Sequence, residues 1–152
     1  MKRVVITGAG RGIGKATAEK FAEKGWEVIG TSTTGKNAKI SLDLANSSSI
    51  TQAAKQIKQQ YGMIDILINN AAIAPEPDTD DIDMDLLRQI LAAKLVDRRI
   101  TVASVDPGWV KTDMGGSSAP RQATQPANEI FDLATSKYQT GQFWLAGKIR
   151  PW

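Results

Sequence analysis

A β-branched run that ends in a glycine-rich turn and continues into a helical pattern constrains the fold more than any other part of this sequence. Val4–Ile6 is followed by TGAGRGIG, and the segment Ile13–Lys24 then places apolar residues at helical spacing. A short apolar strand that stops abruptly is typical of a buried strand in a parallel sheet. Gly25 follows the last helical residue, where glycine commonly ends a helix. The order strand, turn, helix predicts the first unit of an α/β sheet.

The remainder of the chain repeats this alternation. We expect further strands at Glu27–Gly30, Lys39–Leu42, Ile64–Ile68, Ile100–Val105 and Gln142–Ala146. Helices are expected from a cap among Ser47–Ser49 to Tyr61, over residues 86–95, and over Pro126–Ser136. Alternating strands and helices predict an α/β fold, with a mostly parallel sheet and helices on both faces. We expect one domain over residues 1–152.

Composition excludes several kinds of site. The 152 residues include no cysteine and no histidine, so a thiol nucleophile, disulfides and the usual zinc ligands are missing, and we expect no metal. A net charge of +3, with scattered Lys and Arg, argues against nucleic-acid binding. No apolar run approaches the roughly 20 residues that span a bilayer, so we expect no membrane partner. Met1 and two basic residues lead straight into the first strand without a signal peptide, which favours a cytoplasmic location.

Three glycines in the first turn predict a phosphate-binding loop. Gly8, Gly12 and Gly14 lie between the strand and the helix, in the pattern T-G-x-x-x-G-I-G. Ile13 stands where the common pattern G-x-G-x-x-G has its last glycine. Such glycines allow a tight turn and a close approach of the backbone to a pyrophosphate at the helix N-terminus. The alternative is a turn with a purely structural role.

Four further segments accompany this turn in an order that resembles the short-chain dehydrogenase/reductase family. LDLA holds Asp43 in the family's acidic position, and NNAA is similar to the family motif N-N-A-G, with Ala72 in place of glycine. DPGWVKTDMGG resembles the P-G-x-V-x-T segment that borders the nicotinamide, and TGQFWLAGKIRPW resembles the ending of carbonyl-reductase-like members. The resemblance implies a Rossmann-like fold and a dinucleotide cofactor.

The resemblance also indicates which residues bind the cofactor. We expect contacts from Gly8, Arg11, Gly12, Ile13, Gly14, Ser32, Lys36, Asp43, Leu44, Asn69, Ala71, Pro107, Gly108, Val110 and Thr112. Users of NAD tend to have a carboxylate after the second strand, whereas this sequence has hydroxyls at residues 31–33, followed by Lys36. Hydroxyls and cations suit a 2′-phosphate, so we expect NADP rather than NAD. The alternative is that these are ordinary surface-loop residues.

The resemblance fails at the catalytic motif. In this family a Tyr-x-x-x-Lys pair, with a Ser and an Asn, supplies the proton for carbonyl reduction. Here Tyr61 is followed four residues later by Asp65, and Tyr138 by Gln142. Residues 73–99 have room for one loop and one helix, which predicts an internal deletion of one strand and its flanking helices. We therefore expect the strand at Ile100 to lie beside the strand at Ile64.

No other residue is predicted to replace the missing catalysts. Lys94, Lys111 and Asp113 are interpreted as solvated residues, and Ser104 as part of strand packing. Three hypotheses remain. The chain is an NADP-binding oxidoreductase by descent, for a small carbonyl or alcohol substrate and inactive as it stands; a non-catalytic nucleotide-binding or interaction protein; or an incomplete representation of a longer NADP-dependent oxidoreductase. Assembly into homo-oligomers stays open.

Overall fold

Four parallel strands form the sheet of the N-terminal part of the chain. The computed structural model describes residues 1–71 and 100–151. The strands are β1 (Arg3–Ile6), β2 (Glu27–Ser32), β3 (Ile40–Ser41) and β4 (Ile66–Ile68). Their order in the sheet is β3-β2-β1-β4, and each pair is parallel. The α/β fold and the parallel sheet predicted from the sequence are confirmed.

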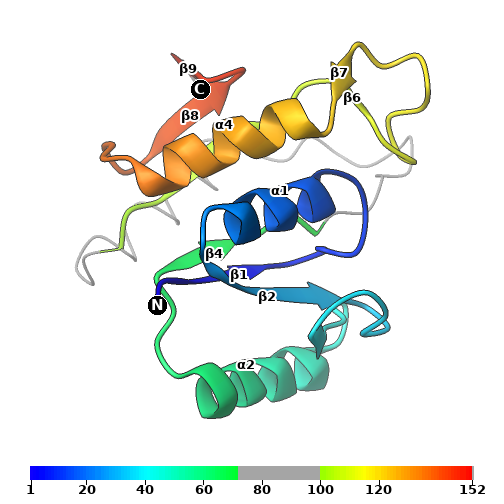
Figure 1. Cartoon of the computed structure of the whole chain (residues 1–152), viewed down its shortest axis with the longest axis vertical. Coiled ribbons are helices and arrows are strands. Elements are labelled where there is room, and N and C mark those ends of the chain that lie inside the picture. Colours follow the sequence, from blue (N-terminus) through cyan, green and yellow to red (C-terminus); the bar gives the residue numbers. More distant parts are fainter. Residues whose placement is uncertain (72–99, 152) are drawn as a thin grey trace.

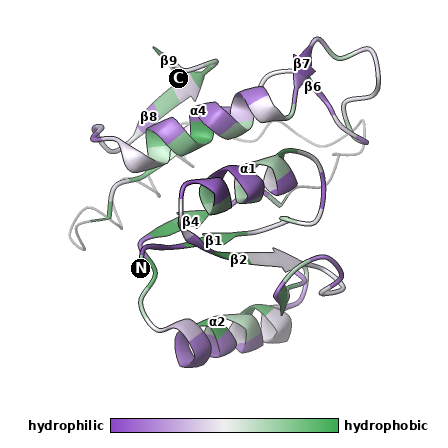
Figure 2. Cartoon of the chain, in the orientation of Figure 1, coloured by the Kyte–Doolittle hydropathy of each residue, from purple (hydrophilic) through white to green (hydrophobic). Residues whose placement is uncertain are grey.

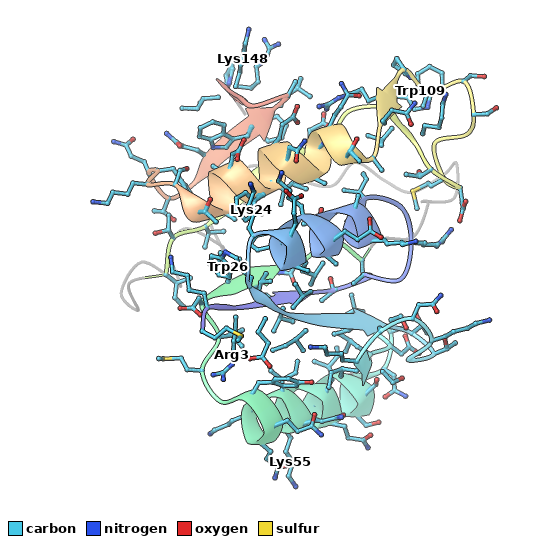
Figure 3. All side chains as sticks on the ribbon, viewed as in Figure 1. Arg3, Lys24, Trp26, Lys55, Trp109 and Lys148 are labelled. Carbon is cyan, nitrogen blue, oxygen red and sulfur yellow. The ribbon has the colours of Figure 1, made fainter. Side chains whose placement is uncertain are left out.

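Helices cover both faces of this sheet, as predicted (Figure 1). Helix α1 (Gly12–Glu23) packs on one face, where Val4, Ile6 and Phe21 are buried together. Helix α2 (Ser47–Tyr61) covers the other face, where Ala53 packs with Val5, Ile29 and Ile40. The alternation of hydrophobic and hydrophilic residues along α2 is visible in Figure 2, and Lys55 points away from the sheet in Figure 3.

The cap of α2 lies one residue earlier than the sequence indicates. Asn46 is the N-cap residue, and its side-chain oxygen accepts hydrogen bonds from the backbone N–H groups of Ser48 and Ser49. Either an Asn or a Ser can cap a helix, so sequence preference alone did not separate the two. The prediction of a serine cap was wrong.

The C-terminal strands form separate sheets. Strands β5 (Ala103–Asp106), β8 (Gln142–Leu145) and β9 (Lys148–Arg150) make one sheet in that order, with β5 and β8 parallel and β9 antiparallel to β8. Strands β6 (Val110–Lys111) and β7 (Arg121–Gln122) form a short pair that the sequence did not predict. The predicted helix near the C-terminus is α4 (Thr124–Thr135).

The prediction that the strand at Ile100 lies beside the strand at Ile64 was wrong. Strand β4 pairs with β1, and β5 pairs with β8, so the two strands belong to different sheets. Helix α4 packs on α1, where the ring of Phe131 lies 4.8 Å from that of Phe21, in an edge-to-face arrangement.

Two further observations concern the described residues. None of their helices is long and apolar enough to cross a bilayer. Within the same two ranges, no group of three or more His, Cys, Asp or Glu side chains could hold a metal ion. The helix predicted over residues 86–95, which contains Lys94, lies outside the described residues.

Candidate dinucleotide-binding site

The turn between β1 and α1 has a shape that requires glycine at two positions. Gly8 has a φ of +67°, and a Cβ atom on it would lie 2.9 Å from the Cα atom of Ala71. A Cβ atom on Gly14 would collide with the carbonyl oxygen of Gly8 and with Nδ2 of Asn70. Only glycine avoids both the left-handed strain and the collision. The turn is therefore built by close contact with the segment that follows β4.

Thr7 and Asn70 hold that contact in place. The Thr7 hydroxyl oxygen accepts hydrogen bonds from the backbone N–H groups of Asn70 and Ala71, both at 3.0 Å. In return, Asn70 Nδ2 donates to the carbonyl oxygens of Thr7 and Gly8 at 2.9 and 3.3 Å. Thr7 is buried, so these bonds are shielded from water. Asn69 and Ala71 were predicted from the sequence as cofactor contacts, whereas Asn70 was missed. Two consecutive asparagines directly after a strand could have indicated its role.

The N-terminus of α1 is left open for an anion. Its N-cap residue is Arg11, whose side chain makes no capping hydrogen bond. A guanidinium has donors only, so it cannot satisfy the first N–H groups of the helix. Gly12, Ile13 and Gly14 all line an adjoining open cleft of about 1930 Å³. Uncapped N–H groups that face a cleft form a ready site for phosphate.

The loop after β2 lies beside the glycine turn. A Cβ atom on Gly10 would be 3.6 Å from the carbonyl oxygen of Lys36 and 3.7 Å from Cβ of Ser32. The Ser32 hydroxyl donates a 2.9 Å hydrogen bond to the carbonyl oxygen of Lys36, which closes the loop. This loop contributes Ser32, Thr33, Thr34, Lys36 and Asn37 to the cleft lining, and no carboxylate.

The segment after β5 approaches the same turn from the C-terminal part of the chain. Arg121 donates to the carbonyl oxygen of Pro107 and forms an ion pair with Glu129 of α4, which fixes the Pro107–Gly108 turn. A Cβ atom on Gly12 would be 3.3 Å from Cγ2 of Thr112. Nη1 of Arg11 lies 2.9 Å from Oδ2 of Asp113, and both side chains are exposed. Asp113, interpreted from the sequence as a solvated residue, thus pairs with a predicted cofactor ligand.

The cleft is lined by most of the residues that the sequence predicted as cofactor contacts. Those in its lining are Gly8, Arg11, Gly12, Ile13, Gly14, Ser32, Lys36, Asn69, Ala71, Pro107 and Thr112. Asp43, Leu44, Gly108 and Val110 are not among the lining residues. Asp43 instead shapes the turn before α2, because its carboxylate accepts a hydrogen bond from the N–H of Ala45. Val110 is buried, and Leu44 is half exposed.

Two side chains in the lining have hydroxyl groups of the kind that carbonyl reduction would need. Ser104 of β5 and Tyr138 both line the cleft. Burial raises the pKa of the Tyr138 phenol above its usual value of 10.0. A cation that lowers the pKa would make the phenol a better acid, and burial does the opposite. The raised pKa makes the Tyr138 phenol a weaker acid than an exposed tyrosine.

The chain is similar to known dehydrogenases and reductases. The family model described as short chain dehydrogenase matches residues 2–91. The chain is 44% identical over 84 residues to 3-oxoacyl-(acyl-carrier-protein) reductase FabG of Vibrio cholerae, covering 47% of this chain and 34% of that protein. It is 43% identical over 75 residues to 3-ketodihydrosphingosine reductase of Bacteroides thetaiotaomicron, covering 46% of this chain and 28% of that protein. The chain thus spans about a third of the length of the curated relatives it matches.

Solved structures share the fold at low sequence identity. A short-chain dehydrogenase from Burkholderia cenocepacia in complex with NADP superimposes with a TM-score of 0.80 at 20% identity, covering 95% of each chain. The carbonyl reductase Sniffer of D. melanogaster gives a TM-score of 0.76 at 20% identity, covering 97% of each chain. These likenesses confirm the Rossmann-like fold expected from the sequence.

Proposed function

The chain belongs to the short-chain dehydrogenase family, and from this premise we propose that it binds NADP(H) in the cleft beside the glycine turn. The observation that carries the proposal is the N-terminus of α1, which has no side-chain cap and lines the cleft beside a turn that Asn70 holds in place by hydrogen bonds. A dinucleotide presents a pyrophosphate, and free N–H groups at a helix N-terminus are suited to receive it.

Three segments around the turn would each bind a different part of the cofactor. Gly12, Ile13 and Gly14 would receive the pyrophosphate. Ser32 and Lys36 would contact the 2′-phosphate, with Arg11 as a second cation, because hydroxyls and cations favour a phosphate where a carboxylate would repel it. The segment from Pro107 to Thr112 would border the nicotinamide, which supplies or accepts a hydride when bound. The preference for NADP over NAD is thus part of the proposal.

We further propose that these 152 residues bind the cofactor without reducing a carbonyl. Hydride transfer to a ketone needs a positioned proton donor, which contributes roughly 10²–10⁴-fold to the rate. Neither tyrosine of the sequence has a lysine four residues later, and Tyr138 has a raised pKa. The chain would then be an oxidoreductase by descent only, without the activity itself.

A second candidate function is reduction of a 3-oxoacyl thioester. Its support is the similarity to proteins named 3-oxoacyl-(acyl-carrier-protein) reductase, at 39–44% identity over 84 residues for the Escherichia coli and Vibrio cholerae proteins. This reaction would require a proton donor that residues 1–71 and 100–151 do not supply in a suitable form. It is the expected activity if the chain is part of a longer enzyme.

Thermal unfolding with and without cofactor tests the binding proposal. NADPH at about 100 times its dissociation constant should add about 2.7 kcal/mol to the free energy of unfolding, which raises the melting temperature. Gly12→Val should abolish the increase, because its side chain would occupy the pyrophosphate position and press on Thr112. Binding is rejected if neither NADPH nor NADH at millimolar concentration shifts the melting temperature.

Turnover separates the two candidate functions. Protein whose mass is verified as 16.4 kDa should oxidise NADPH with a 3-oxoacyl thioester no faster than a control without protein. Turnover by the verified chain would instead support the reductase, and Tyr138→Phe would then show whether that phenol is the donor.

A further inference from the structure

The peptide unit between Pro107 and Gly108 is held by a charged side chain on each side. Its N–H group, from Gly108, donates a 2.7 Å hydrogen bond to Oδ1 of Asp106. Its carbonyl oxygen, from Pro107, accepts a hydrogen bond from Nη1 of Arg121. Hydrogen bonds with a charged partner are about twice as strong as those between neutral groups. Rotation of this peptide plane would therefore break two strong hydrogen bonds at once.

The backbone conformation of the turn is one that such a rotation would change. Gly108 has a φ of +70°, and the sequence Asp-Pro-Gly-Trp places proline second and glycine third. This pattern is typical of a type II turn, from which a type I turn differs by a rotation of the central peptide. Proline and glycine are compatible with both forms, so the local sequence leaves the orientation of the peptide open. The side chains of Asp106 and Arg121 select one orientation.

The side chain of Arg121 is itself held by its surroundings. It forms an ion pair with Glu129 of α4, and the two side chains are only 17% and 24% exposed. A Cβ atom on Gly108 would lie 3.2 Å from Nη1 and 3.3 Å from Cδ of Arg121, so the glycine makes room for the guanidinium. Within residues 1–71 and 100–151, Oε2 of Glu129 is buried without a hydrogen-bond partner, which makes the charge of Arg121 more important to this carboxylate.

The ion pair also links the turn to the helices beside it. Glu129 belongs to α4, the helix whose Phe131 contacts Phe21 of α1. The N-terminus of α1 is the proposed pyrophosphate site. Arg121 therefore connects the turn that would border the nicotinamide with the pair of helices that carries the pyrophosphate site.

We propose that Arg121 and Asp106 are positioning residues for the nicotinamide half of the cofactor. This inference rests on the proposed function, in which the segment from Pro107 to Thr112 borders the nicotinamide. A turn that is locked in one orientation is already ordered when the cofactor arrives, which strengthens binding. The adenosine half would be bound by other segments, so its binding should not depend on these two hydrogen bonds.

Binding of whole and partial cofactor tests the proposal. We compare Glu129→Gln with the same variant to which Arg121→Met has been added, because neither protein then contains a carboxylate at residue 129 without its cation. Titration calorimetry would measure the affinity for NADPH and for adenosine 2′,5′-bisphosphate, which lacks the nicotinamide. The added Arg121→Met should weaken NADPH binding by about threefold to tenfold, and binding of the bisphosphate should not change.

Asp106 provides an independent variant with a conservative rescue. Asp106→Ala removes the acceptor for the N–H of Gly108 and should cause the same selective loss for NADPH. Asp106→Asn retains an acceptor oxygen and should recover most of the affinity. Lys20→Met is the matched control for loss of a cation, because Lys20 is 22% exposed and forms an ion pair with Glu23 in the last turn of α1. It should change neither affinity.

Amide hydrogen exchange measures the turn without any cofactor. Addition of Arg121→Met to Glu129→Gln should accelerate exchange of the Gly108 amide by about tenfold, because the peptide is then free to rotate. The amide of Thr7, which is bonded to Ile68, should not change. Unchanged exchange at Gly108 would overturn the proposal.

The two ligands separate this inference from the proposed function. Equal losses for NADPH and the bisphosphate would show a general loss of folded protein, and no loss for either would show that the turn is not positioned by Arg121; both results overturn this inference alone. If the unsubstituted chain binds neither ligand, the proposed function is rejected and this inference with it. If the variants of Arg121 do not fold, Asp106→Ala and Asp106→Asn still decide.

Discussion

Residues 1–71 and residues 100–151 bury their strands to different degrees. Val4, Ile6, Ile29 and Ile40, from the first three strands, are completely buried. In contrast, every residue of β5 and β8 is only partly buried, and β9 is exposed along its length. The sequence Lys-Ile-Arg accounts for the exposure of β9, but β8 contains Phe143 and Trp144 and is still only partly buried.

The number of neighbouring strands does not alone account for the difference, because the edge strand β3 contains the fully buried Ile40, whereas β8, between β5 and β9, is only partly buried. Strand β1 has a parallel strand on each side, whereas β4 and β5 each have one partner strand among the described residues. A parallel strand is buried when other strands flank it and helices cover both faces. The C-terminal part is held against the N-terminal part mainly by α4 on α1, so that helix contact, rather than a continuous sheet, should decide whether the two parts unfold together.

Removal of the aromatic contact between the parts should have the largest effect on stability. Phe21 is fully buried and touches the rings of both Trp26 and Phe131. Phe21→Ala should lower the free energy of unfolding by about 3–5 kcal/mol, as for other buried phenylalanines. Chemical denaturation followed by tryptophan fluorescence would measure this.

Phe131→Ala is the matched control, because it removes the same ring contact from the C-terminal side. Phe131 is only partly buried, so the loss should be smaller. Amide exchange should accelerate in β5 and β8 while β1 and β2 keep their protection. Uniform acceleration in both parts would contradict the comparison, since it would show one cooperative unit.

A methyl group in the glycine turn should have the next largest effect. The added Cβ of Gly14→Ala would collide with Gly8 and Asn70, so the turn must shift, at a cost of about 1–3 kcal/mol for overpacking. Gly10→Ala is the control in the same loop, because its Cβ would meet no atom closer than 3.6 Å. Melting temperatures with and without NADPH should fall only for Gly14→Ala, and equal losses would show that the turn is not built on this contact.

The N-terminal part was predictable from the sequence because its signals are local. The β-branched run at Val4–Ile6, the glycine turn and the helical spacing up to Lys24 are contiguous, and the structure has β1, the turn and α1 at these positions. Ser32 and Lys36, which the sequence predicted as cofactor contacts, both line the cleft. Periodicity and turn chemistry suffice where an element is followed directly by its packing partner.

The pairing of β5 was not predictable in the same way. The sequence predicted the strand itself, but its partner β8 lies far along the chain, beyond α4. Likewise, Asn70 was missed because its role comes from contacts with Thr7 and Gly8, more than 60 residues earlier. Contacts between segments that are far apart in the chain produce no periodic pattern in the sequence of either segment.

The ion pair between Arg11 and Asp113 gives a smaller test of how the parts meet at the proposed cofactor site. Asp113→Asn should free Arg11 for the 2′-phosphate and strengthen NADPH binding by up to about fivefold, since exposed ion pairs contribute about 0.2–1 kcal/mol. NADH binding should not change. Titration calorimetry with each cofactor would measure both affinities.

Two charge reversals complete this test. Arg11→Glu and Lys36→Glu should each weaken NADPH binding more than NADH binding, because only NADPH carries the 2′-phosphate. Equal losses for both cofactors would show that neither cation contacts that phosphate, and the preference for NADP would then be wrong.

The smallest expected effects concern the pH at which each of the two parts loses stability. Its hydrogen bond to Arg3 holds the pKa of Glu27 below its usual value of 4.5, so this contribution to stability is present above pH 4.5 and is lost as the pH falls further. Burial raises the pKa of Tyr138 above 10.0, so its contribution is present below pH 10 and is lost as the pH rises further.

Glu27→Gln should reduce the acid sensitivity of β1 and β2, and Tyr138→Phe should reduce the alkaline sensitivity of the C-terminal part. Melting curves from pH 3 to pH 11 would show both, and a Tyr138→Phe protein with unchanged alkaline unfolding would show that other groups control it. Because Glu27 of β2 pairs with Arg3 of β1 in the four-stranded sheet and Tyr138 lines the cleft, opposite pH limits would reflect how differently the two parts are held together.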